Sequence, residues 1–196
     1  MKRLLTFSLV VLCVFLYVRC SEGASPAQGH IELGEIYYEA GEYDEAIAEF
    51  KKAIIVAPNY ASAYKGLGLV YSKQGKDDLA VRFYQKAIAI NPKNAEARRK
   101  LGIIYRVQGK TYRAQGKYGL AIGFYQKAIA IDPENAWHHY RLACVYSIQG
   151  RKALSIESLR KAISLDKDCI GMAKREVGFD NIRESPEFQA LIRSVR

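Results

Sequence analysis

Few residues of this 196-residue chain have the types and spacing that chemistry requires. His138 and His139 are adjacent, and neighbours on a helix point about 100° apart, so they form a poor pair of metal ligands. Cys144 and Cys169 could form a disulfide, but we expect two small buried residues, one in mid-helix and one at a repeat boundary. The sequence contains no phosphate-binding glycine loop and no nucleophile motif in a plausible context. It therefore predicts a protein that is not an enzyme and that uses no cofactor and no metal.

The charged residues are unevenly distributed along the chain. The formal net charge is +10, yet residues 27–60 carry seven acidic and only two basic side chains. Residues 61–94, 95–135 and 136–169 are each net positive. Basic proteins often bind nucleic acid, but the N-terminus predicts export, which argues against a nucleic-acid partner. The pattern instead favours binding of an acidic protein or peptide.

Residues 1–23 are predicted to be a secretory signal peptide. A basic start precedes an apolar run over residues 4–18, and small and polar residues follow. The run is shorter than the roughly 20 residues of a membrane-spanning helix, so an uncleaved anchor is the second interpretation. Cys20 lies where a bacterial lipoprotein would be lipidated, although Arg19 is not the small residue expected before it. We expect an exported protein, periplasmic or envelope-associated in a bacterium, with membrane contact only through an uncleaved N-terminus or a lipid anchor.

The elements that must position the charged residues form a repeat array. The segments EYDEAIAEFKKAIIVAPNYA, DDLAVRFYQKAIAINPKNA and YGLAIGFYQKAIAIDPENA resemble one another at a period near 34 residues. Small residues such as Gly34 and Ala46 would let two helices approach closely, and aromatic residues such as Tyr37 and Phe50 would fill the space beside them. The pattern resembles the tetratricopeptide repeat (TPR), in which each unit is a pair of antiparallel helices.

The resemblance covers residues 27 to about 169 and implies an all-α fold. This would be a right-handed superhelical stack of antiparallel helix pairs, with about four repeats and C-terminal capping helices. In the degenerate fourth repeat, Ser155 replaces an alanine and Lys167 replaces the proline. The expected divisions are four repeats at 27–60, 61–94, 95–135 and 136–169, and a cap at 170–196.

Helix ends are marked by residues with known positional preferences. Gly41, Gly75 and Gly150 follow helical runs, where a left-handed residue is needed. Asn94 and Asn135 are expected N-caps of the helices that follow them.

The C-terminal tail has the features of a closing helix. Ser185 can cap a helix that begins at Pro186. Apolar residues then recur at helical spacing: Phe188, Leu191, Ile192 and Val195. We expect this helix to cover the last repeat and close the stack.

The third repeat contains a near-duplication of seven residues, YRVQGKT followed by YRAQGKY. One frame starts the repeat at residue 95 and ends its first helix at Gly109, whereas the other starts at 102 and ends it at Gly116. Both frames fit because seven residues are almost two helical turns. We predict one continuous helix from about 95 to 115 rather than a looped-out tip, with Gly109 in its interior at a cost of about 1 kcal/mol.

The resemblance also implies which residues face a concave binding groove, because the first helix of each pair lines it. Ile31, Glu35, Cys144 and Ile148 belong to these faces. The candidate groove residues are Tyr38, Lys65, Leu69, Lys73, Arg99, Ile103, Arg106, Lys110, Arg113, Trp137 and Tyr140. We expect the groove to bind an acidic and apolar segment of a protein or peptide, anchored by Trp137 or Tyr140.

Two functions fit these features. The first is a non-catalytic adaptor or scaffold on the far side of the inner membrane that binds a peptide or protein in the basic, partly aromatic groove. The alternative is a structural self-assembling protein, in which the acidic repeat 1 of one molecule docks on the basic repeat 3 of another. Because such a contact depends on charge, added salt should weaken the second assembly.

Overall fold

The computed structural model of the protein describes residues 25–193. In this range the chain forms ten α-helices and one short 3-10 helix, with no strand. The predicted signal peptide with Cys20, and Val195 of the tail, lie outside the described residues. The elements are α2 (Pro26–Ala40), α3 (Tyr43–Val56), α4 (Ala61–Lys73), α5 (Asp77–Ile90), α6 (Ala95–Ala114), α7 (Tyr118–Ile131), α8 (Ala136–Ile148), α9 (Lys152–Leu165), α10 (Asp168–Ala173), η1 (Val177–Phe179) and α11 (Pro186–Arg193).

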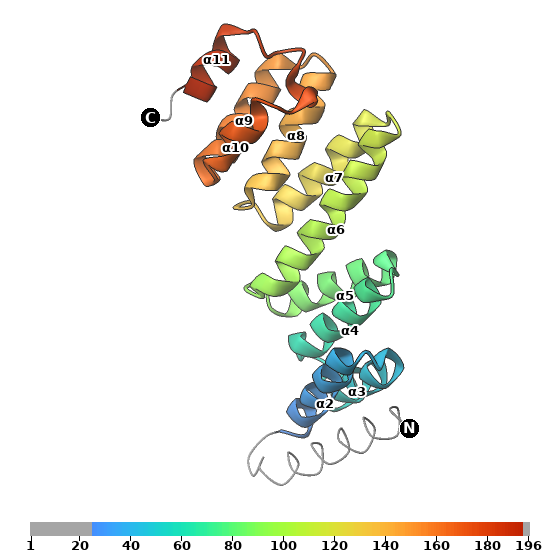
Figure 1. The fold of residues 1–196 in the computed structure, drawn as a ribbon. Coiled ribbons are helices and arrows are strands. Elements are labelled where there is room, and N and C mark those ends of the chain that lie inside the picture. The colour runs from blue at the N-terminus through green and yellow to red at the C-terminus, as the bar shows by residue number, and fades with distance from the viewer. Residues whose placement is uncertain (1–24, 194–196) are drawn as a thin grey trace. The chain divides into compact units, whose positions relative to one another are not determined.

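Consecutive helices fold back on one another through short turns and pack as pairs, α2 with α3, α4 with α5 and α8 with α9 (Figure 1). Neighbouring pairs then stack, α3 on α4 and α7 on α8. The chain divides into two compact units, and the boundary falls between Ala97 and Arg98, near the start of α6. The predicted all-α fold of stacked helix pairs is confirmed. From 25 to 193, no helix is both long and apolar enough to cross a membrane.

Close packing within a pair depends on a glycine of the first helix that faces an aromatic ring of the second. A Cβ added at Gly34 would lie 2.6 Å from the Phe50 ring, and one added at Gly68 would lie 2.7 Å from the Tyr84 ring. Both rings are almost fully buried. The aromatic ring therefore occupies the space that a side chain would need at the glycine position.

The helix ends follow the residue types that mark them. Gly41, Gly75 and Gly150 have φ of 80°, 71° and 69°, in the left-handed region that favours glycine. The Asn94 side chain accepts a hydrogen bond from the backbone N–H of Ala97 at 3.0 Å. Asn135 accepts one from the N–H of residue 137 at 3.2 Å. The predicted caps are confirmed.

Helix α6 runs without a break through the first copy of the duplicated heptad and into the second, where it ends at Ala114 (Figure 1). Gly116, with φ of 71°, is the left-handed residue that follows it. Gly109 lies in its interior, where an added Cβ would be 2.7 Å from the Tyr125 ring of α7. The space that Gly109 leaves for this fully buried ring offsets its poor helix propensity.

The C-terminal segment shares a hydrophobic core with the last helix pair. Ser185 accepts a hydrogen bond from the N–H of Phe188 at 3.3 Å, as expected of the N-cap of α11. Phe179 and Phe188 are fully buried beside Leu159 and Tyr140. The cap thus covers α8 and α9 with large aromatic side chains.

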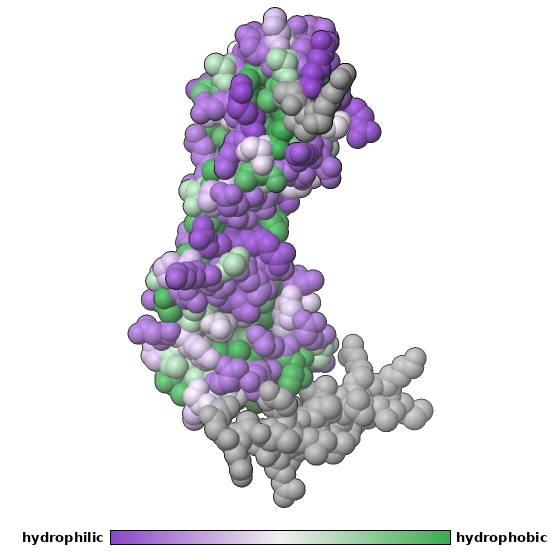
Figure 2. Space-filling view, turned by 90° about the vertical axis from the view of Figure 1, so that its left-hand side faces the viewer, coloured by the Kyte–Doolittle hydropathy of each residue, from purple (hydrophilic) through white to green (hydrophobic). Residues whose placement is uncertain are grey.

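Exposed apolar residues are distributed among polar ones. On the face drawn in Figure 2, purple polar residues predominate and green apolar residues come in small groups between them. The most exposed large apolar residues include Ile55 and Val56 at the end of α3, Leu120 on α7 and Val177 in the cap. Single exposed apolar residues are normal on a soluble surface and mark no site by themselves.

Candidate protein-binding site

The cysteine and histidine side chains of α8 and α10 are buried. Cys144 and Cys169 are free and fully buried, as expected, and burial raises the pKa of the Cys144 thiol to about 12. His139 Nε2 donates a hydrogen bond to the Pro133 carbonyl at 2.8 Å, while His138 lies in a separate, fully buried site. Residues 25–193 contain no cluster of three or more His, Cys, Asp or Glu that could hold a metal ion.

Five residues of α6 form one solvent-facing stripe at alternating spacings of four and three: Arg99, Ile103, Arg106, Lys110 and Arg113, here called the α6 stripe. Arg99, Ile103 and Lys110 are exposed, and the two other arginines are partly buried. The opposite side of the helix carries buried residues such as Leu101 and Ile104. This pattern arises because residues three and four apart share one helix face.

The cations of the α6 stripe are nearly free of carboxylate partners. Within residues 25–193, no carboxylate forms an ion pair with Arg99, Arg106 or Lys110, and Arg113 lies 3.9 Å from Glu176. Burial, and then the neighbouring Arg141, lower the pKa of Arg106. The stripe is therefore a concentration of positive charge that the described residues leave largely unneutralised.

Lys65 is a predicted groove cation of the first compact unit, here called unit 1, and its environment differs from that of the α6 stripe. Lys65 Nζ lies 3.0 Å from a carboxylate oxygen of Glu96 and 3.9 Å from one of Glu35. Its charge is thus already balanced within the unit. Lys73 is exposed, and Leu69 is half-buried.

Tyr38, also on the predicted groove face, is half-buried and packs at a tilt against Tyr43. Burial, together with Glu39, raises the pKa of the Tyr38 hydroxyl, which is therefore protonated at neutral pH.

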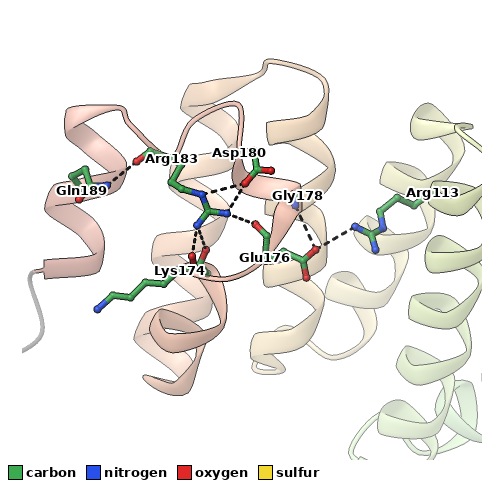
Figure 3. Close-up of polar contacts among 8 residues, drawn as sticks. Arg113, Lys174, Glu176, Gly178, Asp180, Arg183 and Gln189 are labelled. Atoms are coloured by element: carbon green, nitrogen blue, oxygen red, sulfur yellow. Dashed lines mark hydrogen bonds and ion pairs between the residues drawn. The ribbon is translucent and has the colours of Figure 1, made fainter.

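On α8, Trp137 is the exposed aromatic residue that the sequence led us to expect, with 38% of its surface accessible. The Arg141 guanidinium lies 5.4 Å from the Trp137 ring centre and 5.7 Å from that of Tyr140. Arg141 Nη1 also lies 3.4 Å from the Glu176 carboxylate. The same carboxylate lies 3.9 Å from Arg113 Nη1 (Figure 3). One carboxylate therefore links the arginines of α6 and α8.

Three residues predicted to face the groove are buried, and these predictions were wrong. Tyr140 is 1% exposed because Phe179 of the cap packs edge-on against its ring, at a centroid distance of 5.6 Å. Cys144 lies beneath Gly178, and Ile31 belongs to the core of unit 1. Tyr140 therefore cannot anchor a partner.

The chain's own C-terminal segment covers the side of α8 that was expected to face the groove. A Cβ added at Gly178 would lie 3.2 Å from the Cβ of Cys144, so only glycine fits comfortably there. Asn181 Nδ2 donates to the Ser147 carbonyl at 3.1 Å and to the Ile148 carbonyl at 3.3 Å. The sequence predicted a cap, but not that its extended part would lie along α8.

Arg183 fixes the shape of this segment (Figure 3). Its guanidinium donates to the carbonyl oxygens of Lys174 and Glu176 and to the carboxylate of Asp180, the last at 2.6 Å. The turn has little regular structure of its own, and the Arg183 guanidinium stabilises it because it donates to several backbone carbonyls at once. The network holds the backbone of Glu176 in place beside Arg113 and Arg141.

Arg141 and Glu176 were not among the predicted site residues. Arg141 follows Trp137 by four residues on a helix, a spacing that brings side chains together, so the stacked pair could have been found in the sequence. Glu176 offered no such signal, because its position depends on a turn built by distant contacts.

Family models of tetratricopeptide repeats match most of the described chain. A model described as "TPR repeat" matches residues 34–75 and 109–150. Three others, each described as "Tetratricopeptide repeat", match residues 61–94, 83–121 and 139–169.

Solved structures of the protein MamA are similar in fold. A crystal structure of MamA has a TM-score of 0.54 and 24% identity, covering 79% of this chain and 85% of that one. A structure of MamA from Desulfovibrio magneticus RS-1 has a TM-score of 0.55 and 20% identity, covering 87% and 91%. Another has a TM-score of 0.51 and 26% identity, covering 78% of both chains. No curated protein sequence matches this chain.

Taken together, the family matches span residues 34–169, the same range in which paired helices, glycine–aromatic contacts and left-handed helix ends recur. The MamA structures show independently that the fold is that of a helical repeat protein. The chain belongs to the tetratricopeptide repeat family.

Proposed function

We propose that this protein is a non-catalytic adaptor that binds an acidic, partly apolar segment of another protein on the surface formed by the α6 stripe and Trp137. The main observation behind this proposal is that Arg99, Arg106 and Lys110 have no carboxylate partner within residues 25–193. Unpaired cations on one face raise the local positive potential and steer acidic partners toward it.

The apolar residues of this surface support a protein partner. Ile103 is 36% exposed and shares a helix face with Arg99 and Arg106. Trp137 is 38% exposed and stacks with Arg141. Half-exposed tryptophan and arginine side chains are enriched where binding energy is concentrated in protein interfaces. Stacked helical repeats commonly bind partners on extended surfaces of this kind.

Export of the adaptor remains part of the proposal. The basic start and apolar run of residues 1–23 support it. The partner would then be a protein of the bacterial envelope or periplasm.

Reversing the charge of the α6 stripe tests the adaptor proposal. The full chain and its triple variant Arg99→Glu, Arg106→Glu, Lys110→Glu are immobilised and exposed to an envelope extract, and the retained proteins are quantified by mass spectrometry. We expect the specific partner to be retained at least about tenfold less by the variant, since losing several charge contacts costs more than about 1.4 kcal/mol.

A matched control changes the net charge equally at other exposed positions. Lys51→Glu, Arg82→Glu and Arg160→Glu lie on the second helices of three pairs, and all three residues are exposed. This variant should retain the partner like the unmodified chain. Equal losses in both variants, or none in either, would contradict binding at the α6 stripe.

A second candidate function, self-assembly, rests on the acidic end of the chain. Exposed acidic residues without an ion pair in the described part of the chain lie around the turn between α2 and α3: Glu39, Glu42, Asp44 and Glu45. Their charge complements the α6 stripe of a second molecule. A contact between two different surfaces of like molecules is head-to-tail and need not close.

Light scattering over a salt series tests self-assembly. The mean mass should fall toward that of the monomer as NaCl rises from about 0.05 M to about 0.5 M, because salt screens exposed charges. The α6 triple variant should be monomeric throughout. A wild-type monomer at the lowest salt excludes this second function and leaves the adaptor proposal untouched.

A further inference from the structure

A small pocket lies beside Trp137, where the start of α8 meets the end of α10. Its volume is about 250 Å³, below the roughly 300–1,000 Å³ of small-molecule sites and suited to one side chain. The lining residues are Trp137, Tyr140, Arg141, Met172, Arg175 and Glu176, and we call it the Trp137 pocket.

Apolar and polarisable groups form part of the wall. The Trp137 indole meets the buried Tyr140 ring at 68°, with centroids 5.8 Å apart, so its position is fixed by an edge-on contact. Met172 lines the pocket from α10, and its unbranched thioether can adapt to the shape of a ligand. Such a wall accepts an apolar or aromatic side chain.

The charged part of the wall has more donors than acceptors. Glu176 is the one carboxylate in the lining, and Arg113 and Arg141 already contact it. Arg175 has no carboxylate partner within residues 25–193, and Arg141 Nε is buried without an acceptor. The guanidinium groups of the pocket are therefore not saturated by the residues that the structure describes.

We propose that the Trp137 pocket anchors an apolar or aromatic side chain of the partner whose neighbouring carboxylate binds Arg175. The proposal rests on the proposed adaptor function and specifies the partner's chemistry: a large apolar residue flanked by acidic ones. The excess of guanidinium groups disfavours a basic segment, since like charges repel. Glu176 connects the pocket to the α6 stripe through Arg113, so one bound segment can contact both.

Trp137 is the only tryptophan of the chain, so its fluorescence reports occupancy of this pocket directly. The probe is an acetylated, amidated peptide Gly-Glu-Phe-Glu-Gly, titrated into the full chain. We expect a saturable shift of the emission maximum. Replacing Phe by Ala in the peptide should weaken binding by at least about tenfold, because the buried phenylalanine side chain supplies the apolar part of the contact. Replacing both Glu residues by Lys should abolish the saturable shift.

Variants of the protein separate the pocket from general charge attraction. Arg175→Gln should weaken binding of the Glu-Phe-Glu peptide by about fivefold, as expected for loss of a partly exposed charge pair. Met172→Ala should weaken it by a similar factor. The control Arg82→Gln removes the same charge from exposed α5 and should bind like wild type.

Several outcomes overturn the proposal. These are equal affinity for the Glu-Phe-Glu and Lys-Phe-Lys peptides, equal effects of Arg175→Gln and Arg82→Gln, and the absence of a saturable signal. If the α6 triple variant loses the captured partner while Arg175→Gln and Met172→Ala retain it fully, the pocket proposal fails and the adaptor proposal stands. Loss of capture in all three variants supports both.

Discussion

The variant Phe179→Ala is expected to lower the free energy of unfolding by about 4 kcal/mol, within the range for truncating a fully buried phenylalanine. Phe179 is 0% exposed. Its ring lies edge-on to Tyr140 and tilted on Phe188, with both centroid distances 5.6 Å. Removing it leaves a cavity between α8 and the cap that the rigid neighbouring helices cannot fill. Urea unfolding followed by circular dichroism and by Trp137 fluorescence measures the loss.

Val177→Ala is the matched control for this variant. Val177 lies in the same 3-10 helix, two residues earlier, but is 74% exposed. Its truncation should change stability by less than about 0.5 kcal/mol. Similar stabilities of the two variants would show that the cap does not form part of the core.

His138 is expected to make the protein less stable in mild acid. Burial, and then the charges of Arg106 and His139, lower the pKa of His138 to about 4, although Asp132 at 3.8 Å opposes the shift. The unfolded chain binds a proton on this side chain as pH falls through about 6.5, whereas the folded chain does not until about 4. The contribution of His138 to the free energy of unfolding is therefore complete above pH 6.5. It is lost as pH falls toward 4, and the loss from this group alone is about 3 kcal/mol.

Urea unfolding at several pH values between 7.5 and 4.5 tests this dependence. His138→Gln does not titrate, so its stability should fall less with acid than that of the wild-type chain, whatever its stability at pH 7.5. His139→Gln keeps His138, so its stability should still fall with acid; because the charge of His139 is one cause of the low pKa of His138, the fall should be slightly smaller than in wild type. If His138→Gln and wild type lose stability in parallel, the histidine is not the group responsible.

Much of the fold was predictable because its signals are local. A glycine after a helical run, an asparagine before the next one and a recurring glycine–aromatic pair each act within one repeat, so Gly75, Asn94 and Gly68 could be interpreted from their neighbours in the sequence. The continuous helix α6 was predictable for the same reason, since a seven-residue insertion keeps every side chain on its face.

The candidate site was predicted only in part, because its remaining features depend on contacts between distant residues. The stripe from Arg99 to Arg113 follows from helical spacing. By contrast, Lys65 is paired with Glu96, and Tyr140 is covered by Phe179. Both facts depend on where another segment folds back, which periodicity does not specify. The groove prediction from family resemblance thus failed where the cap lies against α8.

The glycines of α6 also couple substitutions in neighbouring repeats. Gly102 lies seven residues before Gly109, ahead of the two heptad copies; Gly109 receives Tyr125, while an added Cβ at Gly102 would lie 2.9 Å from His138 Nε2. The glycines that face an aromatic ring in repeats 1 and 2 are Gly34 and Gly68, and the residues seven positions before them are Ala27 and Ala61.

In those repeats the residue equivalent to His138 in the next repeat is also small, Ala63 and Ala97. The imidazole at 138 fits beside a glycine at 102, where the Cβ of any other residue would force the imidazole to shift. The two positions are coupled: a side chain at 102 crowds the imidazole, and truncating His138 leaves a void beside Gly102, so the effects of the two substitutions on stability should not be additive.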